Sequence, residues 1–201
     1  SKLKVGYKFG LEFLNSKNGR KFVSNLKNKI IFGDYKLADI PKTCMSAIKA
    51  VKDLKLNYIT IHISSGLNAI KAAKKVAGST KVIGVTILTS LDNRSLKEIG
   101  FDKKVGKLVL HQARLAAKAK LDAIVCSPHE IKIVKKVFKG EIITPGIRLP
   151  NDKKSDQKRV MTPKQAFKNG ADVLVIGRSI TSGNIKNNIK KVINELKWNE
   201  S

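Results

Sequence analysis

The sequence predicts an α/β protein with a (β/α)8 barrel fold, in which the first βα unit is largely missing from this chain of 201 residues. Two observations lead to this prediction. Short apolar segments rich in β-branched residues alternate with segments of helical period, which indicates a parallel sheet covered by helices. Polar residues able to do chemistry follow nearly every apolar segment. The carboxyl ends of barrel strands bring such residues to one point, whereas an open sheet would spread them.

Seven apolar segments are the predicted strands, and six segments of helical period accompany them. The strands are residues 3–9 (LKVGYKF), 29–35 (KIIFGDY), 58–63 (YITIHI), 81–88 (KVIGVTIL), 122–126 (DAIVC), 141–145 (EIITP) and 172–177 (DVLVIG). The helices are residues 44–54, 66–78, 107–120, 129–140, 162–170 and 184–198. Several of these helices end at a glycine, which supplies a left-handed C-terminal cap without steric cost.

One domain is expected over residues 1–201, because 42% apolar residues suffice for one core and the composition shows no break. A barrel needs eight strands and commonly about 250 residues, so we expect the missing unit to precede the first strand. No apolar stretch approaches the roughly 18 residues that span a bilayer, and no leader opens the chain, which predicts a soluble cytoplasmic protein. Cys44 and Cys126 lack metal-ligand spacing and are expected to be reduced core residues.

The net charge of +26 is typical of proteins that bind polyanions, because clustered cations bind phosphate backbones through counterion release. In this chain the lysines are scattered, and no basic tail, finger spacing or RNP-like aromatic motif is found. Aromatic residues, at 5%, leave little for base stacking. We therefore predict no nucleic-acid and no membrane partner, and a solvated lysine-rich surface. A basic, non-catalytic RNA-binding protein is the alternative.

The segment FGDYKLADIPKT places two carboxylates around one lysine in a chain with few acidic residues. Side chains two apart on a strand point the same way, so Asp34 and Lys36 are expected to share one face, with Asp39 in the following loop. A lysine between two carboxylates stays protonated and is suited to donate a proton and anchor charge. Lys8, at the end of an adjacent strand, extends the run to a Lys-Asp-Lys-Asp array. An ion-paired strand end is the alternative interpretation.

The segment VIGRSIT after the last strand is a predicted anion site. In barrels, the loops after strands seven and eight often hold a phosphate, and here Gly177 permits close approach while Arg178 supplies a charged fork. Arg148 in TPGIR and Gln157 in DQKRVMTP favour this interpretation over an ordinary turn with a surface arginine. His62 follows a strand with no second ligand at metal spacing, so no metal is expected.

Eight motifs together closely resemble the orotidine 5'-phosphate decarboxylase family, in the order that family shows them and through nearly the whole chain. They are YKFGLEF, DYKLADIPKT, TIHISSG, GVTILTSLD, VCSP, TPGIR, DQKRVMTP and LVIGRSIT. The resemblance implies a homodimeric (β/α)8 barrel enzyme with shared active sites. The enzyme is a carboxy-lyase that converts orotidine 5'-monophosphate (OMP) to uridine 5'-monophosphate (UMP) and carbon dioxide, the last step of UMP biosynthesis. It implies no cofactor and no metal.

The resemblance also implies a role for each matching residue. Lys36 would donate a proton to C6 of the pyrimidine, and Lys8 and Asp34 would complete the charged array that holds it. Asp39, with Ile40 and Thr43, would reach into the partner subunit's site. The implied substrate contacts are Ile40, Pro41 and Thr43 beside Asp39, Thr89 at the pyrimidine edge, Gln157, Gly177 and Arg178 at the phosphate, and Arg148 near it.

This sequence departs from the family pattern in two places. The family has DLK after an apolar residue, whereas this chain has DYK after Gly33, which is expected to loosen the strand. The family also has an earlier strand whose aspartate contacts the ribose, and the sequence given starts after that segment. Two lysines compete for the first position of the array. The KFGLEF pattern favours Lys8, with Lys4 as the alternative.

A sugar-phosphate lyase similar to hexulose-phosphate synthase is the alternative within the same superfamily. Such an enzyme shares the D-x-K-x-x-D run and uses magnesium. The stretches TPGIR and DQKRVMTP argue against it.

Overall fold

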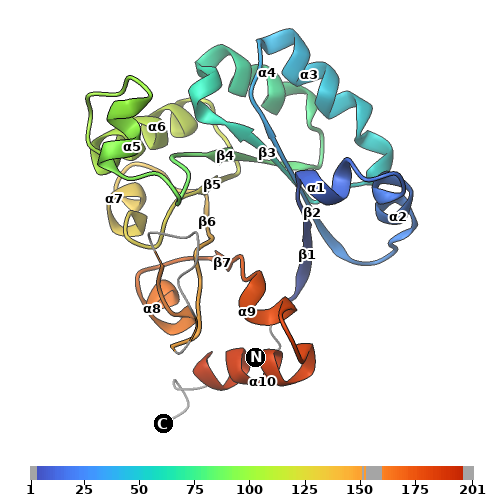
Figure 1. Cartoon of the computed structure of the whole chain (residues 1–201). Coiled ribbons are helices and arrows are strands. Elements are labelled where there is room, and N and C mark those ends of the chain that lie inside the picture. The colour runs from blue at the N-terminus through green and yellow to red at the C-terminus, as the bar shows by residue number, and fades with distance from the viewer. Residues whose placement is uncertain (1–3, 151, 153–159, 197–201) are drawn as a thin grey trace. The chain divides into compact units, whose positions relative to one another are not determined.

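The computed structural model describes residues 4–150, 152 and 160–196 (Figure 1). The chain divides into two compact units. The first comprises Ser1–Val85 with Arg114–Ile124, and the second comprises Thr86–Ala113 with Val125–Ser201. Strands alternate with helices in both, which confirms the α/β class. The expectation of one domain over residues 1–201 stays a prediction.

Four parallel strands form the sheet of the first unit. They are β1 (Gly6–Phe9), β2 (Ile30–Leu37), β3 (Tyr58–His62) and β4 (Lys81–Val85), paired in sequence order. The pairing of β1 with β2 places Lys8 opposite Phe32. Between β2 and β3 the register shifts between Gly33 and Leu37, which marks a bulge near the carboxyl end of β2. This bulge contains the D-x-K pair of the sequence motif.

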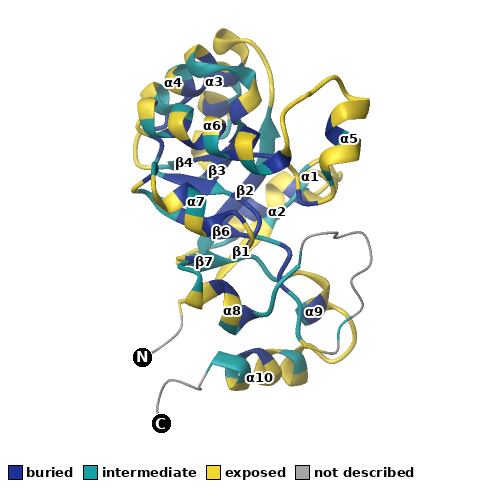
Figure 2. Cartoon of the chain, turned by 90° about the vertical axis from the view of Figure 1, so that its left-hand side faces the viewer, coloured by how far each residue is buried: buried dark blue, intermediate teal, exposed yellow. Residues whose placement is uncertain are grey.

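Helices cover this sheet. They are α1 (Leu11–Leu14), α2 (Gly19–Asn25), α3 (Pro41–Ala50), α4 (Leu67–Val76) and the short 3-10 helices η1 (Lys52–Leu54) and η2 (Ile63–Ser65). Helix α3 packs against α4. Each of the two helices buries one face, including Ile48 of α3 and Ile70 of α4, and exposes the other (Figure 2). The buried faces and the strands form the core of this unit.

Strands β3 and β4 are largely buried, as expected for a parallel sheet covered by helices, whereas β1 is mostly exposed. Ile59, Ile61 and Ile83 are almost completely buried. Gly84 of β4 allows this packing, because a Cβ atom there would lie 2.8 Å from the side chains of Ile63 and Leu121. Any larger residue at position 84 would force these core side chains apart.

The second unit contains the later strands and helices. Strand β5 (Ala123–Val125) and helix α6 (Val105–Lys118) contribute residues to both units. The elements that belong wholly to the second unit are α5 (Asn93–Glu98), α7 (Ile131–Lys135), β6 (Glu141–Thr144), α8 (Pro163–Lys168), β7 (Val173–Leu174), α9 (Arg178–Thr181) and α10 (Ile185–Leu196). Strand β6 pairs in parallel with β7. Helix α8 begins with a capping box in which Thr162 and Gln165 satisfy each other's backbone N–H groups.

The same hydrogen-bond arrangement occurs at the amino-terminal ends of three strand pairs, where a polar side chain lies just before one of the two strands. Asn57 precedes β3, Asp122 precedes β5 and Asp172 precedes β7. Their side-chain oxygens accept hydrogen bonds of 2.8 Å from the backbone N–H groups of Ile31, Val82 and Ile142, respectively. Each of the three also donates its own backbone N–H to the carbonyl of the same partner residue. These paired bonds fix the starting register of the strands.

All seven predicted strands are confirmed, with shifted ends. Strand β4 ends at Val85 rather than at residue 88, and β2 extends to Leu37. The predicted helices are found, and the structure adds the short helices α1, α2, α5 and α9, which were not predicted. Cys44 and Cys126 are buried and form no disulfide with each other, as expected. Among the described residues, none of the helices combines the length and the apolar composition needed to cross a bilayer.

Candidate active site

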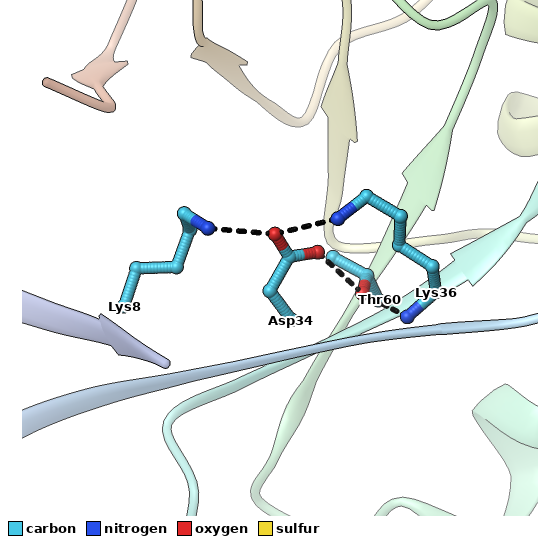
Figure 3. Close-up of polar contacts among 4 residues, drawn as sticks. All are labelled: Lys8, Asp34, Lys36 and Thr60. Carbon is cyan, nitrogen blue, oxygen red and sulfur yellow. Dashed lines mark hydrogen bonds and ion pairs between the residues drawn. The ribbon is translucent and has the colours of Figure 1, made fainter. Parts of the chain in front are cut away.

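The carboxylate of Asp34 lies between two ammonium groups in the first unit (Figure 3). Lys8 Nζ and Lys36 Nζ each donate a hydrogen bond of 2.8 Å to the same oxygen, Asp34 Oδ2. The other carboxylate oxygen, Oδ1, accepts a bond of 3.1 Å from the hydroxyl of Thr60. The two lysines and the aspartate that the sequence pattern identified as candidate site residues therefore form one contiguous cluster.

Three neighbouring strands position this cluster. Lys8 comes from β1, Asp34 and Lys36 from β2, and Thr60 from β3. The pairing of β1 with β2 brings Lys8 beside the end of β2, and in parallel strands the carboxyl ends meet at one edge of the sheet. The structure places Lys8 at Asp34, while Lys4 is exposed.

The backbone of Lys36 is not that of a regular strand. Its φ angle is 47°, in the left-handed region that residues other than glycine rarely adopt. It lies inside the bulge of β2, and its N–H donates a hydrogen bond of 2.8 Å to Thr60 Oγ1 instead of to a strand partner. Asp34 and Lys36 thus meet as expected, but through a bulge and not through the simple alternation of a strand. Strain of this kind is typical of functional sites.

The cluster within this chain contains one carboxylate and two ammonium groups, which leaves one positive charge in excess. The expected Lys-Asp-Lys-Asp array has a second carboxylate, that of Asp39, which the family resemblance assigns to the partner subunit's site. Asp34 is only 6% exposed. Burial acts to raise the pKa of Asp34, but the nearby ammonium groups of Lys8 and Lys36 outweigh it and hold the pKa below its ordinary value.

His62, at the end of β3, lies in the field of the same charges. Burial and the positive charge of Lys36 lower the pKa of His62, and the negative charge of Asp34 offsets only part of this effect. The imidazole is therefore neutral near pH 7. Within the described part of the chain, no three His, Cys, Asp or Glu side chains are grouped as metal ligands.

Asp39 lies in the loop after β2, as predicted, and outside the cluster. In the described residues its carboxylate makes no ion pair; Oδ1 accepts the backbone N–H of Ile40 at 2.7 Å. The side chain of Ile40 is 65% exposed, and Pro41 and Thr43 belong to the first turn of α3. This segment presents exposed side chains next to a strand end.

The other predicted site residues belong to the second unit. Thr89 is buried in the loop after β4. Arg148 donates its backbone N–H to the carbonyl of Met161 and its guanidinium Nη1 to the carbonyl of Ile147, at 2.9 Å. Helix α9 begins at Arg178, and Gly177 is its N-cap residue. Gln157 lies outside the described residues.

Two features of the first unit escaped the sequence analysis. Thr60 is one; its only signal was a polar residue in the middle of the apolar strand YITIHI. The other is the relation between Gly33 and Tyr35. A Cβ atom on Gly33 would lie 2.9 Å from the ring of Tyr35 and 2.8 Å from Leu56, so the tyrosine ring fills the space that a side chain at position 33 would occupy. Gly33 and Tyr35, which both depart from the family pattern in this strand, therefore compensate each other in volume.

An ammonium group fixed beside a carboxylate can stabilise negative charge that develops on a neighbouring carbon and can then protonate it. Two ammonium groups that share one carboxylate provide this capacity without a free hydroxyl, thiol or imidazole nucleophile. The cluster is therefore suited to a reaction that passes through a carbanion.

Comparison with known proteins gives a consistent result. A model described as the Orotidine 5'-phosphate decarboxylase / HUMPS family matches residues 3–192. The orotidine 5'-phosphate decarboxylase of Coxiella burnetii is 43% identical over 189 residues, which cover 89% of this chain and 78% of that protein. The one of Aquifex aeolicus is 39% identical over 201 residues, which cover 97% of this chain and 84% of that protein.

A solved structure gives the same answer for the fold. The crystal structure of orotidine 5'-phosphate decarboxylase from Lactobacillus acidophilus matches with a TM-score of 0.79 and 31% sequence identity, over 94% of this chain and 86% of that chain. The fold class predicted from the sequence, that of a (β/α)8 barrel, is thereby confirmed.

Proposed function

The chain belongs to the orotidine 5'-phosphate decarboxylase / HUMPS family, and we infer that it is a carboxy-lyase that converts OMP to UMP and carbon dioxide. The observation that carries this inference is the Lys8-Asp34-Lys36 cluster, with one carboxylate between two ammonium groups at the carboxyl ends of adjacent strands. Relatives that share about two fifths of the sequence over most of their length are OMP decarboxylases. The reaction belongs to pyrimidine biosynthesis, and the expectation of a cytoplasmic enzyme stays a prediction.

The chemistry that the cluster supports is direct. The bond between C6 and the substrate carboxylate breaks, carbon dioxide leaves, and the electron pair stays at C6. The ammonium of Lys36 stabilises this pair and transfers a proton to C6, and the neutral amine then regains a proton from solvent. Because the charge at C6 exists only in and after the transition state, a fixed ammonium there lowers the barrier more than it improves substrate binding.

Asp34 has two roles in this proposal. Its charge keeps both lysines oriented through bonds of 2.8 Å. It also keeps a negative charge near the position of the leaving carboxylate, so repulsion is relieved when carbon dioxide departs. The lowered pKa of Asp34 supports both roles, because the side chain stays ionised across the neutral range.

Substrate contacts away from the reacting carbon are also proposed. Gly177, Arg178 and Gln157 hold the phosphate, with Arg148 near it, and Thr89 contacts the pyrimidine edge. The position of Arg178 directly after Gly177, in the segment that follows β7, supports the phosphate contact, since a guanidinium favours an anion. Binding of the distant phosphate holds the ring in the position where Lys36 acts.

The proposed enzyme is a homodimer with shared sites. Asp39 reaches the partner's array, and Ile40, Pro41 and Thr43 contact substrate or partner beside it. The exposed side chain of Ile40 and the absence of an ion pair for Asp39 among the described residues support this assignment. In a monomer the array would then lack its second carboxylate.

The family description also names HUMPS, so a sugar-phosphate lyase is the competing function. The test is to mix the chain with OMP and follow carbon dioxide release and UMP formation, with and without EDTA. We expect stoichiometric UMP at the same rate in both arms. Decarboxylation that EDTA abolishes would contradict the metal-free mechanism, and no UMP at any enzyme concentration would contradict the proposed function.

A further inference from the structure

Thr60 makes two hydrogen bonds with one hydroxyl group at the centre of the cluster. Its side chain lies in the middle of β3 and is 1% exposed. The oxygen accepts the backbone N–H of Lys36 at 2.8 Å, and the hydroxyl hydrogen is donated to Asp34 Oδ1 at 3.1 Å (Figure 3). One buried atom thus connects the backbone of one array member to the carboxylate of another.

The bond to Lys36 compensates for an irregular backbone. The bulge between Gly33 and Leu37 takes Lys36 out of the regular pairing with β3, and its φ of 47° is held at a cost. A backbone N–H left without an acceptor in this partly buried position would be unfavourable. The hydroxyl of Thr60 supplies that acceptor and so stabilises the conformation that directs the Lys36 side chain toward Asp34.

The bond to Asp34 fixes the rotation of the carboxylate. Oδ2 accepts hydrogen bonds from both ammonium groups, and Oδ1 accepts one from the Thr60 hydroxyl (Figure 3). Without a donor on Oδ1, the carboxyl group could rotate partly about its Cβ–Cγ bond. Oδ2 would then leave the position that the two ammonium groups share.

We propose that Thr60 is a positioning residue for decarboxylation, whose hydroxyl holds the Lys36 backbone and the Asp34 carboxylate in the arrangement that the reaction needs. Valine and alanine at this position remove both bonds, and serine keeps them. Only the kinetic part of the test, the measurement of OMP turnover, depends on the proposed function. A second arm, exchange of the Lys36 amide hydrogen, tests the same contact without any turnover.

The pH dependence gives a signature that a purely structural role would not produce. The charged or titratable groups that face Asp34 are Lys8 from β1, Lys36 from β2 and His62 from β3. Loss of the Thr60 donor removes a bond to the ionised form of Asp34, which raises its pKa. The acid limb of the turnover profile should therefore move to higher pH in Thr60→Val.

The experiment compares Thr60→Val, Thr60→Ser and a matched control, Thr80→Val. The hydroxyl of Thr80 also makes a hydrogen bond within the first unit, but to the backbone carbonyl of Leu56 at 2.9 Å. Thr80 lies just before β4 and contacts no residue of the array through this bond. We expect Thr60→Val to lower kcat about 10- to 100-fold with KM changed less than about threefold, since small misplacements at a reacting centre cost rate more than binding. Thr60→Ser and Thr80→Val should stay within about threefold of the parent kcat.

Hydrogen exchange completes the test. The Lys36 amide should exchange at least about tenfold faster in Thr60→Val than in the parent, while the amide of Ile83 stays unchanged. A folded Thr60→Val with parental kcat and parental Lys36 exchange overturns the proposal, as does a Thr60→Ser variant as defective as Thr60→Val. If Thr60→Val does not fold, Thr60→Ala, which adds no methyl group near Asp34, takes its place with the same two outcomes. A parent without OMP turnover refutes the proposed function, and the exchange arm still decides on Thr60.

Discussion

Two aspartates of the first unit each form ion pairs with lysine, but they differ in charge balance and in their position along the strands. Asp34 is shared by Lys8 and Lys36 through a single oxygen at the carboxyl ends of the strands. Asp122 accepts two bonds from Lys74, at 2.6 and 2.7 Å, at the opposite end, just before β5. The first cluster has an excess cation, and the second is a balanced pair.

The second pair is also tied into the backbone. Asp122 Oδ2 accepts the N–H of Val82 at 2.8 Å, so one carboxylate joins helix α4, through Lys74, to the start of β4. None of the three residues joined here, Lys74, Val82 and Asp122, has a positive φ, in contrast to Lys36. The comparison agrees with the division of labour in barrel folds, in which the carboxyl ends of strands carry chemistry and the amino ends carry stability.

The sharpest test of this division is to remove one lysine from each pair. Lys36→Ala should lower turnover of OMP by more than about 100-fold, and affinity for UMP should change less than about tenfold, because the ammonium acts on charge that only the transition state has. Lys74→Ala should keep the parental kcat and lose stability. Steady-state kinetics, UMP titration and urea unfolding measure the three quantities.

Either of two results would break the comparison. Lys36→Ala that retains more than about a hundredth of the parental turnover would remove Lys36 from the role of proton donor. Lys74→Ala that is folded but inactive would show that chemistry depends on the amino-terminal pair as well. A Lys36→Arg variant is a useful addition, since it keeps the charge but changes the shape and acidity of the donor.

A second prediction concerns Asp39, which lies at the same strand end as Asp34 but outside its cluster. If Asp39 serves the partner's site, Asp39→Ala and Arg178→Ala are both inactive, but for different reasons. Each variant lacks a residue that a different subunit contributes to the shared site. Subunit exchange between them should produce heterodimers in which one site has both defects and the other has none. Activity should return to about half that of the parental dimer per heterodimer.

The control is a mixture of Lys36→Ala with Arg178→Ala. Under the proposal both residues serve their own subunit's site, so every site in that heterodimer keeps one defect and activity should not return. Native mass spectrometry verifies exchange, and circular dichroism verifies folding. Verified heterodimers of Asp39→Ala with Arg178→Ala that remain inactive would refute action of Asp39 across the interface.

The sequence predicted the elements well and the details of the array less well. Strands such as YITIHI are visible as apolar β-branched runs, and the D-x-K-x-x-D pattern identified Asp34 and Lys36 correctly as neighbours. The positive φ of Lys36 was not predictable, because lysine has no preference for that conformation and a distant residue, Thr60, stabilises it. Long-range hydrogen bonds leave no periodic signal in a sequence.

Local signals were available at two further places. Asp92 accepts the N–H of Ser95 and caps α5, and aspartate at such a position is a recognised start signal for a helix. Pro41 opens α3 earlier than the predicted start at residue 44, as proline at the first helical position often does. The compensation between Gly33 and Tyr35 had no such signal, since it depends on where a ring folds in three dimensions.

A third prediction concerns the contribution of the Lys74–Asp122 pair to stability. Asp122→Ala should lower the free energy of unfolding by about 1–3 kcal/mol, because it leaves the Val82 N–H and a partly buried ammonium without their acceptor. The exposed pair of Arg20 with Asp53 is the matched control, and Asp53→Ala should cost less than about 1 kcal/mol. Urea midpoints give both values. Equal effects of the two substitutions would show that the Asp122 pair is an ordinary surface pair.

The smallest expected effect is on the pH dependence of stability, and it tests whether the array imposes its field on neighbouring groups. The pKa of His62 is lowered in the folded chain by burial and by Lys36, whereas an unfolded chain has the ordinary histidine value of about 6.5. Between these two values the unfolded state binds more protons than the folded state, so stability rises with pH there. The contribution is complete above about pH 6.5 and declines as the pH falls from that value toward the folded pKa.

His62→Asn should therefore reduce the loss of stability between pH 7.5 and pH 5, measured as the difference in urea midpoint between the two pH values. The other two histidines are present in both proteins, so the comparison between variant and parent isolates His62. In a Lys36→Ala background the effect of His62→Asn should shrink, because the repulsion that depresses the His62 pKa is partly gone. If the urea midpoint changes with pH to the same extent with and without His62, the array does not shift the pKa of His62. The electrostatic effect of the array would then be limited to the residues in direct contact with it.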